Sequence, residues 1–600
     1  MQIQQLDPTM PRQRRQIEQL LTANGLRYDD MDYYVAAVDE PSGEIVGGGG
    51  LCGGIIKCIA VDDAHRGEAV ANTIVSHLIA VAAQRGHHCV RLFTKPRNLR
   101  LFESLSFRLL AEAPEAILME TGIGGIEAVK RELESEKRKV KSEESITPSP
   151  SHPITGCIVM NCNPFTLGHL YLIEQAAQQV DRLFVMVVRA DCSMFGYDER
   201  LDMARKGTAH MANVTVIAGN DYTVGATTFP TYFLKRIDDA TDTQMTLDID
   251  LYRRHIAPAL GATVRFVGSE PTDALTHRYN DMMRSMLGDV RQVTRLEKDG
   301  LPVSASLVRR AMTNNDYHRA AALVPATTLP YLMAHLATRA LKAELNTTPK
   351  PGLVDSHNNG AHRDMDHALM SASIRTLHPY LARLALMGYA RTLPTAHDVQ
   401  QVGIEAEESM LRATDGVNTH RGALFAIGLA VVAVAHTIYL QANGMAPAPG
   451  DIASESRRHI MAMATQMAAT RGTHGDKACR KTPGHAPLKG ALDNAREGYA
   501  TLFDDWLPFY DSHIRMGDTH VMHRTLLRIM ASLDDTNIVY RTDLDTLRAV
   551  QRESAEALAD FSIDALEAMN ASFVQRNISP GGSADMLSLV VFLHAFRRKP

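Results

Sequence analysis

Short apolar runs alternate with helical segments through the middle of the chain. Four of these runs, at 157–160, 183–188, 214–217 and 264–267, have the length and composition of buried parallel strands. A helix is predicted directly after the first run, because apolar residues recur at helical spacing over 172–180. This order predicts a doubly wound parallel sheet, which binds its ligands at the carboxyl ends of the strands.

The pattern differs on either side of this region. Before it, strands are expected at 33–38 and 44–50 and an amphipathic helix at 70–85, which together predict a smaller α/β domain. After it, long stretches rich in Ala, Leu and Met at helical spacing predict an all-α domain. A multidomain chain is expected for 600 residues in any case, since a single hydrophobic core does not grow to that size.

Two changes in the residue pattern divide the chain. A run of mixed charge at 127–144 is followed by a Ser/Pro-rich segment at 145–151, which predicts a solvated helix and then a flexible tether. The strand signal ends near 325–330. We therefore expect domains at 1–124, 154–325 and 330–600, with a linker at 125–153.

Composition narrows the possible partners and the compartment. A formal charge of −5 offers no basic field for nucleic acid or an anionic membrane. Seven cysteines without paired metal spacing, and no signal peptide at the N-terminus, favour a reduced cytoplasmic chain. Residues 423–440 are long enough to span a membrane, but they are alanine-rich and include Gly428 and His436. A buried helix of the all-α domain is the favoured interpretation.

The loop at 162–169 is the strongest candidate site. It ends the first predicted strand and opens a helix, whose free N–H groups and dipole suit a polyphosphate. Asn163, Phe165 and Gly168 are expected to bind the nucleotide, and Gly168 would allow close approach of the backbone. Thr166 and His169 would direct hydrogen-bond donors at the α-phosphoryl group. Taken alone, the loop is equally compatible with a plain helix N-terminus capped by Thr166.

A second segment supports the phosphate site. Ser304, Ser306 and Arg309 open another helix and offer the hydroxyls, N–H groups and guanidinium that a β,γ-phosphate needs. Together, the two segments resemble the signatures of the HxGH/TxGH nucleotidyltransferase superfamily, whose sheet is Rossmann-like. Such a reaction depends on positioning and charge stabilisation, with Mg²⁺ bridging the phosphates of ATP.

The resemblance narrows to one family, citrate lyase ligase, over roughly residues 1–325. The segments that carry it are 156–169, 228–235, 265–271 and 279–280. It implies that acetate attacks ATP to give acetyl-adenylate and pyrophosphate, and that the prosthetic-group thiol of the citrate lyase acyl carrier protein then takes the acetyl group. It also implies that Gly268 and Glu270 lie near the adenosine. Phosphopantetheine adenylyltransferase shares the fold, but it is a single short domain without the 1–122 extension.

The N-terminal domain resembles a GNAT-type acyltransferase through residues 66–71 and 101–107. It departs from that pattern because Ala69 and Ser106 stand where the family usually has glycine. One hypothesis is that this domain receives the phosphopantetheine-like arm of the carrier protein. The alternative is a degenerate module kept for docking.

Four polar clusters interrupt the predicted all-α domain and suggest one shared cavity for a metal-bound triphosphate. Asp364, Asp366 and Asp585 are the expected metal ligands or acids, and Asn418, His420 and Arg421 the expected phosphate contacts. Gly581, Gly582 and Ser583 open a further helix that would also bind the nucleotide. The excess of carboxylate and amide groups favours Mg²⁺ over the zinc that His362 suggests.

These clusters resemble triphosphoribosyl-dephospho-CoA synthase over roughly residues 330–600. The resemblance implies that a ribose hydroxyl of dephospho-CoA displaces adenine from ATP while the triphosphate stays on the sugar. Where that family usually shows Gly-Ala-Arg-Gly-Glu-Ala, this chain has Leu492, Asp493 and Asn494 in place of the central residues, with Arg496 and Glu497 just downstream.

The two resemblances are consistent with one maturation enzyme for citrate lyase. Two alternatives stay open at this point. The C-terminal half could serve malonate decarboxylase, which uses the same prosthetic group, or the chain could be a non-catalytic docking factor with decayed sites.

Overall fold

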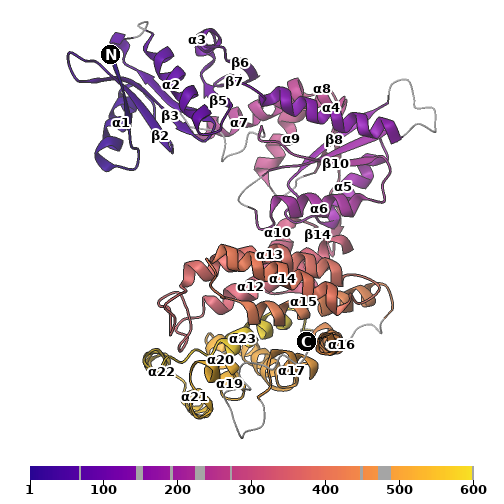
Figure 1. Ribbon diagram of the computed structural model, residues 1–600. Coiled ribbons are helices and arrows are strands. Elements are labelled where there is room, and N and C mark those ends of the chain that lie inside the picture. Colours follow the sequence, from indigo (N-terminus) through magenta and orange to yellow (C-terminus); the bar gives the residue numbers. More distant parts are fainter. Residues whose placement is uncertain are drawn as a thin grey trace. The chain divides into compact units, whose positions relative to one another are not determined.

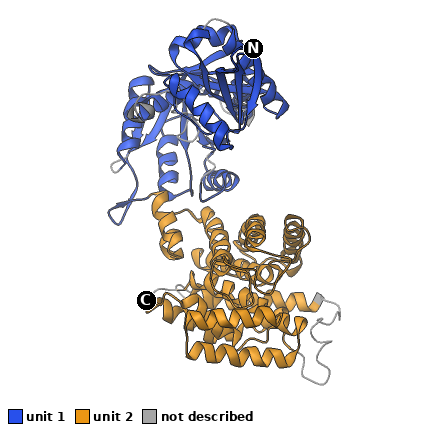
Figure 2. Cartoon of the chain, turned by 90° about the vertical axis from the view of Figure 1, so that its left-hand side faces the viewer, with its two compact units in different colours: residues 1–303 blue, residues 304–600 orange. Residues whose placement is uncertain are grey.

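The computed structural model describes residues 1–65, 69–143, 153–189, 193–222, 237–269, 273–445, 451–470 and 488–597. The chain forms two compact units, Met1–Val303 and Ser304–Pro600 (Figure 2). Each unit is described by itself below.

The first unit begins with a seven-stranded sheet in the order β1-β2-β3-β4-β5-β7-β6. Its strands are antiparallel except for β4 and β5, which pair in parallel through only two positions, Ile55 with Arg91 and Ile56 with Leu92. Because the pairing is so short, the two strands diverge beyond it. The elements are β1 (Gln2–Leu6), α1 (Pro11–Ala23), β2 (Tyr33–Val38), β3 (Ile45–Cys52), β4 (Ile55–Val61), α2 (Val70–Gln84), β5 (Cys89–Thr94), α3 (Leu99–Ser104), β6 (Arg108–Glu112) and β7 (Ile117–Gly122).

The second sheet of this unit has five strands in the order β10-β9-β8-β11-β12, all parallel. This is the predicted doubly wound sheet, and the four predicted strands fall on β8 to β11. The fifth strand, β12, was not predicted. The elements are β8 (Thr155–Met160), α5 (Leu167–Ala177), β9 (Arg182–Val187), α6 (Tyr197–Thr208), β10 (Val214–Ala218), α7 (Ile237–Leu251), the π-helical turn η3 (Tyr252–Ile256), α8 (Ala257–Leu260), β11 (Val264–Gly268), α9 (Ala274–Met286) and β12 (Val290–Val293).

The two sheets of the first unit share one hydrophobic core, which includes Leu20 of α1, Leu133 of α4 and Phe184 of β9. Helix α4 (Gly125–Glu143) covers the predicted charged linker, and it is not merely a solvated helix, because Ile126 and Leu133 are buried. The predicted tether at 145–151 lies outside the described residues. The N-terminal domain therefore packs against the parallel-sheet domain through α4.

The second unit is all-α in its described residues (Figure 1). Helix α15 is apolar enough to cross a membrane by length and composition alone, but most of it is buried between other helices. It therefore forms the centre of the core, as predicted. The helices are α10 (Ala305–Thr313), α11 (Tyr317–Ala321), α12 (Leu329–Leu345), α13 (His367–Gly388), α14 (Ala396–Ala413), α15 (Arg421–Ala442), α16 (Ile452–Thr470), α17 (Ala491–Arg496), α18 (Leu507–Arg515), α19 (Val521–Met530), α20 (Thr536–Arg541), α21 (Leu544–Ala559), α22 (Ile563–Gln575) and α23 (Gly581–His594).

The boundary between the units lies at Ser304, earlier in the chain than the end of the strand signal near 325–330. Helices α10 and α11 belong with the second unit, because Arg339 of α12 donates to the carbonyl oxygens of Met312 and Thr313. The ring of Tyr317 also packs on Phe596, with centroids 4.8 Å apart. These contacts join residues far apart in the sequence, so the local pattern does not indicate them.

Candidate active sites

The predicted nucleotide loop joins β8 to α5, and Thr166 is the N-cap of the helix. The backbone N–H of His169 donates to Thr166 Oγ1 at 3.3 Å, and the backbone N–H of Thr166 donates to His169 Nδ1 at 3.0 Å. This reciprocal capping fixes both side chains at the carboxyl end of a central strand. The arrangement is the predicted strand-to-helix turn.

The hydrogen bonds at this turn also set the protonation of His169. Because Nδ1 accepts a hydrogen bond from the Thr166 backbone, the proton of the neutral ring lies on Nε2. Burial, and then the nearby positive charge of Arg295, lower the pKa of His169 to about 4. His169 is therefore a neutral donor at physiological pH.

Buried side chains within the loop pack against the interior of the fold. Phe165 is fully buried and stacks on the ring of His169. Its ring also fills the space beside Gly207, because a Cβ on Gly207 would lie 2.4 Å from it. Asn163 is buried, and its Oδ1 accepts from the backbone N–H of Phe195 at 3.1 Å. Asn163 and Phe165 thus shape the loop from inside the fold.

Gly168 is needed for packing as well as for any ligand. A Cβ on this residue would lie 2.7 Å from the carbonyl oxygen of Val303. The chain leading to the second predicted phosphate segment therefore runs directly over the loop, since Ser304 is the next residue after Val303.

Gly268 ends β11 at the same edge of the sheet, and its carbonyl oxygen accepts from Asn280 Nδ2 at 3.0 Å. Position 268 is open, because a Cβ there would meet only Leu172, at 4.0 Å. Glu270 lies outside the described residues. Of the two residues predicted to contact adenosine, only Gly268 lies in the described part of the chain.

Arg200 supports this edge and was not identified from the sequence. Its fully buried guanidinium donates to the backbone oxygens of Asn161, Val188 and Phe195. It ties the ends of β8 and β9 to α6. One arginine in a charged helix carries no sequence signal for this role.

In the second unit, Ser304 is the N-cap of α10 and accepts from the backbone N–H of Leu307 at 3.3 Å. Its hydroxyl also lies 3.2 Å from that of Ser306. Arg309 follows one turn later on the same helix. The predicted pattern of two hydroxyls and a guanidinium at a helix start is therefore present.

The second unit contains a cavity of about 1040 Å³, large enough for a nucleotide. Four of the polar segments contribute to its wall, as the sequence suggested. The predicted residues that line it are Asp364, Asn418, His420, Arg421, Gly581, Gly582 and Asp585.

His420 lines this cavity as a neutral donor. Thr419 donates to Ser373 Oγ at 2.7 Å, so the Ser373 proton points to His420 Nδ1 at 2.8 Å and leaves the ring proton on Nε2. Burial, and then the charge of Lys350, lower the pKa of His420 to about 3. Among the described residues, nothing bonds its Nε2.

Asn418 and Arg421 lie at the same helix start. The Oδ1 of Asn418 accepts from the backbone N–H of Arg421 at 3.2 Å, and the Arg421 side chain pairs with Glu407. Glu407, which also lines the cavity, had not been identified as part of the site.

Buried aspartates occupy two helix starts where we expected phosphate. Asp535 accepts from the backbone N–H groups of Gly582 and Ser583 and from the Ser583 hydroxyl. Asp585 bonds the backbone of Ala423 and fills the space beside Gly422, where a Cβ would lie 1.9 Å from its Oδ2. The amides of 582 and 583 are therefore used by the protein itself.

The three predicted metal ligands do not form one group. Asp364 lies beside His362, 3.8 Å away, with a side chain 65% exposed, whereas Asp585 is buried. Asp366 is the N-cap of α13, accepts from the Leu369 N–H at 2.8 Å and does not line the cavity. Their carboxylate oxygens do not all lie within 4.8 Å of one another, as ligands of one ion would.

Two other buried acids, Asp535 and Glu344, lie near Asp585. Burial, and then the charges of Asp535 and Glu344, raise its pKa well above the ordinary value. Lys350 pairs with Glu344 in the same interior. Three buried carboxyl groups with raised pKa values and one ammonium therefore lie beside the cavity.

The departure at 490–497 is also visible. Leu492, Asn494 and Lys489 line the cavity, but neither Arg496 nor Glu497 does. Glu497 instead pairs with Lys489 at 2.7 Å, so the cation facing the cavity here is Lys489.

In the N-terminal domain, Ala69 and Ser106 have positive φ angles of 60° and 64°. Both residues replace a usual glycine, and the backbone keeps the glycine conformation. Residues 66–68, which complete the predicted CoA-binding turn, lie outside the described residues.

Comparisons with known proteins agree with this division. Family models match at 1–107 for the acetyltransferase (GNAT) family, at 155–332 for the citrate lyase ligase C-terminal domain and at 330–600 for ATP:dephospho-CoA triphosphoribosyl transferase.

Curated relatives match each half of the chain. A [citrate [pro-3S]-lyase] ligase of Klebsiella pneumoniae is 38% identical over 53% of this chain and 92% of its own length, and one of Escherichia coli is 37% identical over 53% and 89%. A probable 2-(5''-triphosphoribosyl)-3'-dephosphocoenzyme-A synthase of Salmonella gallinarum is 35% identical over 44% of this chain and 89% of its own length. The chain is a fusion that belongs to the citrate lyase ligase family through its first half and to the triphosphoribosyl-dephospho-CoA synthase family through its second.

Proposed function

We propose that the chain is a bifunctional maturation enzyme of citrate lyase. In the first reaction, an acetate oxygen attacks the α-phosphorus of ATP, which forms acetyl-adenylate and releases pyrophosphate. The thiol of the carrier protein's prosthetic group then attacks the acetyl carbon and releases AMP. The observation that carries this proposal is the capped turn at which Thr166 fixes His169 as a neutral Nε2–H donor.

In this reaction, His169 Nε2–H and the amides at the start of α5 stabilise charge on the α-phosphoryl oxygens. Ser304, Ser306 and Arg309 bind the departing pyrophosphate. Gly268 leaves room for the adenosine, and Glu270 is proposed to contact it. Neutral His169 takes up no proton in this scheme, which suits a step whose nucleophile is already an anion.

The test is pyrophosphate release from ATP with purified chain and varied acetate. Release that requires acetate, with stoichiometric AMP once a thiol acceptor is added, supports the proposal. Pyrophosphate release that is independent of acetate, or none at high enzyme concentration, contradicts it.

We propose that the second unit transfers the triphosphoribosyl group of ATP to dephospho-CoA and releases adenine. The cavity has the volume for both substrates to meet. His420 and Arg421 would bind phosphate oxygens, and Asn418 holds the start of α15 beside them. Asp364, at the exposed rim, would act near the metal or the leaving base.

Mg²⁺ is part of this proposal, and the residues present fit it. Burial raises the pKa values of Asp535, Asp585 and Glu344, and a divalent cation beside them would favour their ionised forms, which otherwise share the single ammonium of Lys350. Asp585 would hold it with the triphosphate. The ion would supply charge neutralisation of the triphosphate during departure of adenine.

Chromatographic detection of free adenine after incubation with ATP and dephospho-CoA tests the second reaction. Adenine must appear only with both substrates. The Asp585→Asn chain should lose it, and a chain that releases adenine equally well with that change would contradict the proposed role of Asp585.

We infer a cytoplasmic protein whose partner is the acyl carrier subunit of citrate lyase. The free thiols of the described cysteines agree with a reducing compartment. The first half favours this carrier over that of malonate decarboxylase, since its relatives from Klebsiella pneumoniae and Escherichia coli are citrate lyase ligases. The N-terminal domain is proposed to receive the prosthetic arm of the carrier.

A further inference from the structure

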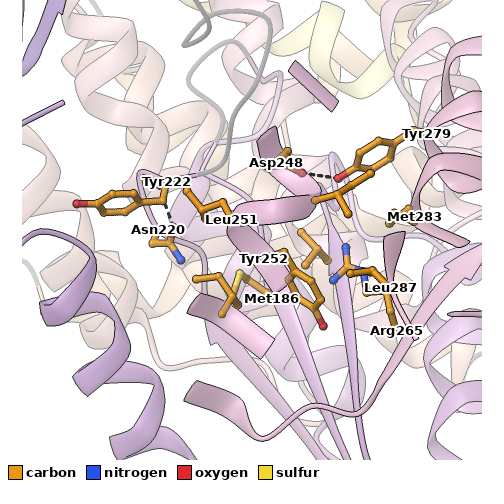
Figure 3. Close-up of a pocket in the computed structure, with 13 residues that line it drawn as sticks. Met186, Asn220, Tyr222, Asp248, Leu251, Tyr252, Arg265, Tyr279, Met283 and Leu287 are labelled. Atoms are coloured by element: carbon orange, nitrogen blue, oxygen red, sulfur yellow. Dashed lines mark hydrogen bonds between the residues drawn. The ribbon is translucent and has the colours of Figure 1, made fainter. Parts of the chain in front are cut away.

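A small cavity of about 40 Å³ lies on one face of the parallel sheet in the first unit (Figure 3). It has room for about three waters, since one water needs roughly 10–15 Å³ of such space. Its Asp248 carboxylate accepts the hydroxyl proton of Tyr279. A nucleotide cannot enter this cavity, whereas the cavity of about 1040 Å³ in the second unit is large enough for one.

Two side chains that line the large cavity each have a buried polar atom without a hydrogen-bond partner among the described residues. One atom is Nε2 of His420, for which the proposed function already supplies a phosphate oxygen. The other is the hydroxyl oxygen of Tyr499, a residue that is 4% exposed and was not identified from the sequence. A buried hydroxyl without a partner is unfavourable, so Tyr499 lacks an acceptor that a ligand can supply.

The backbone around Tyr499 holds this side chain in place. Its N–H donates to the carbonyl oxygen of Asn494 at 2.8 Å, which closes the end of α17, and its own carbonyl oxygen accepts from the N–H of Phe503 at 3.1 Å. Between these two bonds Tyr499 has a φ of 48°, in the left-handed region. That conformation is strained for an aromatic residue, and strain of this kind concentrates at functional sites.

Apolar residues form the wall that Tyr499 adjoins. The preceding residue, Gly498, packs directly on α16, because a Cβ there would lie 2.8 Å from the Met461 side chain. Helices α15, α16 and α17 pack against one another. The described residues of α16 and α17 that line the cavity are all uncharged, and α15 adds two leucines; these residues are Leu424, Leu429, Met467, Ala491, Leu492 and Asn494. This wall suits an uncharged group of a ligand rather than a phosphate.

Asp585 relates Tyr499 to one of the two substrates. Burial, and then the charge of Asp585, raise the pKa of the Tyr499 hydroxyl, so it remains a protonated donor. The proposed function places the triphosphate of ATP at Asp585. The other end of the same nucleotide is adenine, an uncharged planar ring with apolar faces and with ring nitrogens that accept hydrogen bonds.

We propose that Tyr499 and this apolar wall bind the adenine of ATP, with the Tyr499 hydroxyl donating to the ring nitrogen N3 or N7. The proposal rests on the proposed transfer of the triphosphoribosyl group. In that reaction the bond between C1″ and N9 breaks and its electron pair moves into the purine, while a ribose hydroxyl oxygen of dephospho-CoA bonds to C1″. The proton that this hydroxyl loses balances the one that adenine gains. Because N3 and N7 gain negative charge as the bond breaks, the hydrogen bond from Tyr499 strengthens in the transition state.

The first test is steady-state kinetics of adenine release by the full chain. Tyr499→Phe should lower the rate about tenfold or more, the usual effect of losing a hydrogen bond to a group that gains charge, and should leave the KM for dephospho-CoA within twofold. Tyr510→Phe is the matched control, because Tyr510 is also 4% exposed and does not line the cavity. Tyr499→Phe should not lower the thermal unfolding midpoint, since the hydroxyl that it removes has no partner among the described residues. A hydroxyl with a merely structural role would lower that midpoint when removed.

The second test removes the accepting nitrogen. The analogues 3-deaza-ATP and 7-deaza-ATP each carry a C–H group in place of N3 or N7. With one analogue, Tyr499→Phe should cause less than a twofold further loss, because the hydrogen bond is already absent, and with the other it should still cause about a tenfold loss. Equal losses with ATP and both analogues would overturn the proposal. So would a rise in the KM for dephospho-CoA without such coupling, which would assign Tyr499 to that substrate.

The third test is calorimetric titration of the full chain with free adenine, which separates binding from the reaction. The unchanged chain and Tyr510→Phe should bind adenine about tenfold more tightly than Tyr499→Phe does. This difference, in a chain that transfers nothing, would support the subsite and refute the proposed function. A chain that releases adenine equally fast with and without Tyr499→Phe would overturn the subsite and leave the proposed function standing. Adenine binding that Tyr499→Phe leaves unchanged, in an inactive chain, would refute both.

Discussion

At the scale of single residues, burial and one hydrogen bond set the protonation of each site histidine. His169 and His420 are both neutral, because burial lowers their pKa values and one ring nitrogen accepts a bond from the protein. Each therefore presents Nε2–H to its site. Neither ring is suited to donate a proton in general acid catalysis near pH 7.

The first prediction concerns His169. Replacing it with alanine should lower the rate of acetate-dependent pyrophosphate release about 100- to 1000-fold, the usual effect of losing one charge-stabilising donor. The rate of the unchanged chain should show no titration of this ring between pH 6 and 9, because its pKa is about 4. A pH–rate profile with an inflection near 6.5 that His169→Asn removes would contradict this.

The same pKa has a consequence for stability. A folded-state pKa near 4, below the ordinary 6.5, means that the unfolded chain binds the proton more readily. The contribution of His169 to stability is therefore complete above about pH 6.5 and is lost as the pH falls towards 4.

The second prediction concerns the two residues that replace glycine. Ala69 and Ser106 are exposed and have left-handed backbone conformations, which cost L-residues about 1–2 kcal/mol. Ala69→Gly and Ser106→Gly should each stabilise the first unit by about 1 kcal/mol, measured as a rise in its thermal unfolding midpoint. Ser104→Gly, within α3, is the control and should destabilise. If Ala69→Gly and Ser106→Gly lowered the thermal unfolding midpoint, the side chains of Ala69 and Ser106 would stabilise the fold by more than their backbone strain costs.

At the scale of elements, helix starts in the second unit are capped in two ways. Asp366 caps α13 from the adjacent position, with one backbone bond. Asp535 caps α23 from a distant segment, is buried, and accepts bonds from Gly582, Ser583 and Asn537. The second kind ties separate helices together as well as satisfying a helix end.

The third prediction follows from this difference. Asp535→Ala should destabilise the second unit by about 3 kcal/mol or more, because it leaves several buried donors unpaired. Asp366→Ala should cost only about 1 kcal/mol, the usual value for an exposed N-cap. Denaturant unfolding followed by circular dichroism measures both, and equal losses would contradict the distinction.

At the scale of the whole molecule, two units carry the two sites. The nucleotide loop lies in the first unit and the large cavity in the second. The large cavity uses residues of the second unit from Glu344 onwards, and the segment with Ser304 and Arg309 lies before them in the chain.

The fourth prediction is that the two reactions can be inactivated separately. His169→Ala should lower acetate-dependent pyrophosphate release about 100- to 1000-fold and leave adenine release within twofold of the unchanged chain. Asp585→Asn should have the opposite effect. Assays of both products on each variant, with circular dichroism to verify folding, measure this. Loss of both activities in a folded single variant would mean that the sites are coupled.

Much of the architecture was predictable from local pattern. The strands β8 to β11, the buried helix α15 and the turn with Thr166 and His169 follow from periodicity and short-range capping, which involve neighbours within a few residues. The GNAT-like conformation at Ala69 and Ser106 also agrees with the resemblance. These features depend on interactions between residues that lie close together in the sequence.

Contacts between distant segments were decided only by the tertiary structure. The hydrogen bonds of Arg200 to Asn161 and the placement of Asp535 on the amides of Gly582 and Ser583 each join residues tens of positions apart. The sequence by itself determined which chemistry each half carries, because catalytic turns are local. Burial decided which charges are paired and which helix ends are already occupied, because burial is a property of the packed chain.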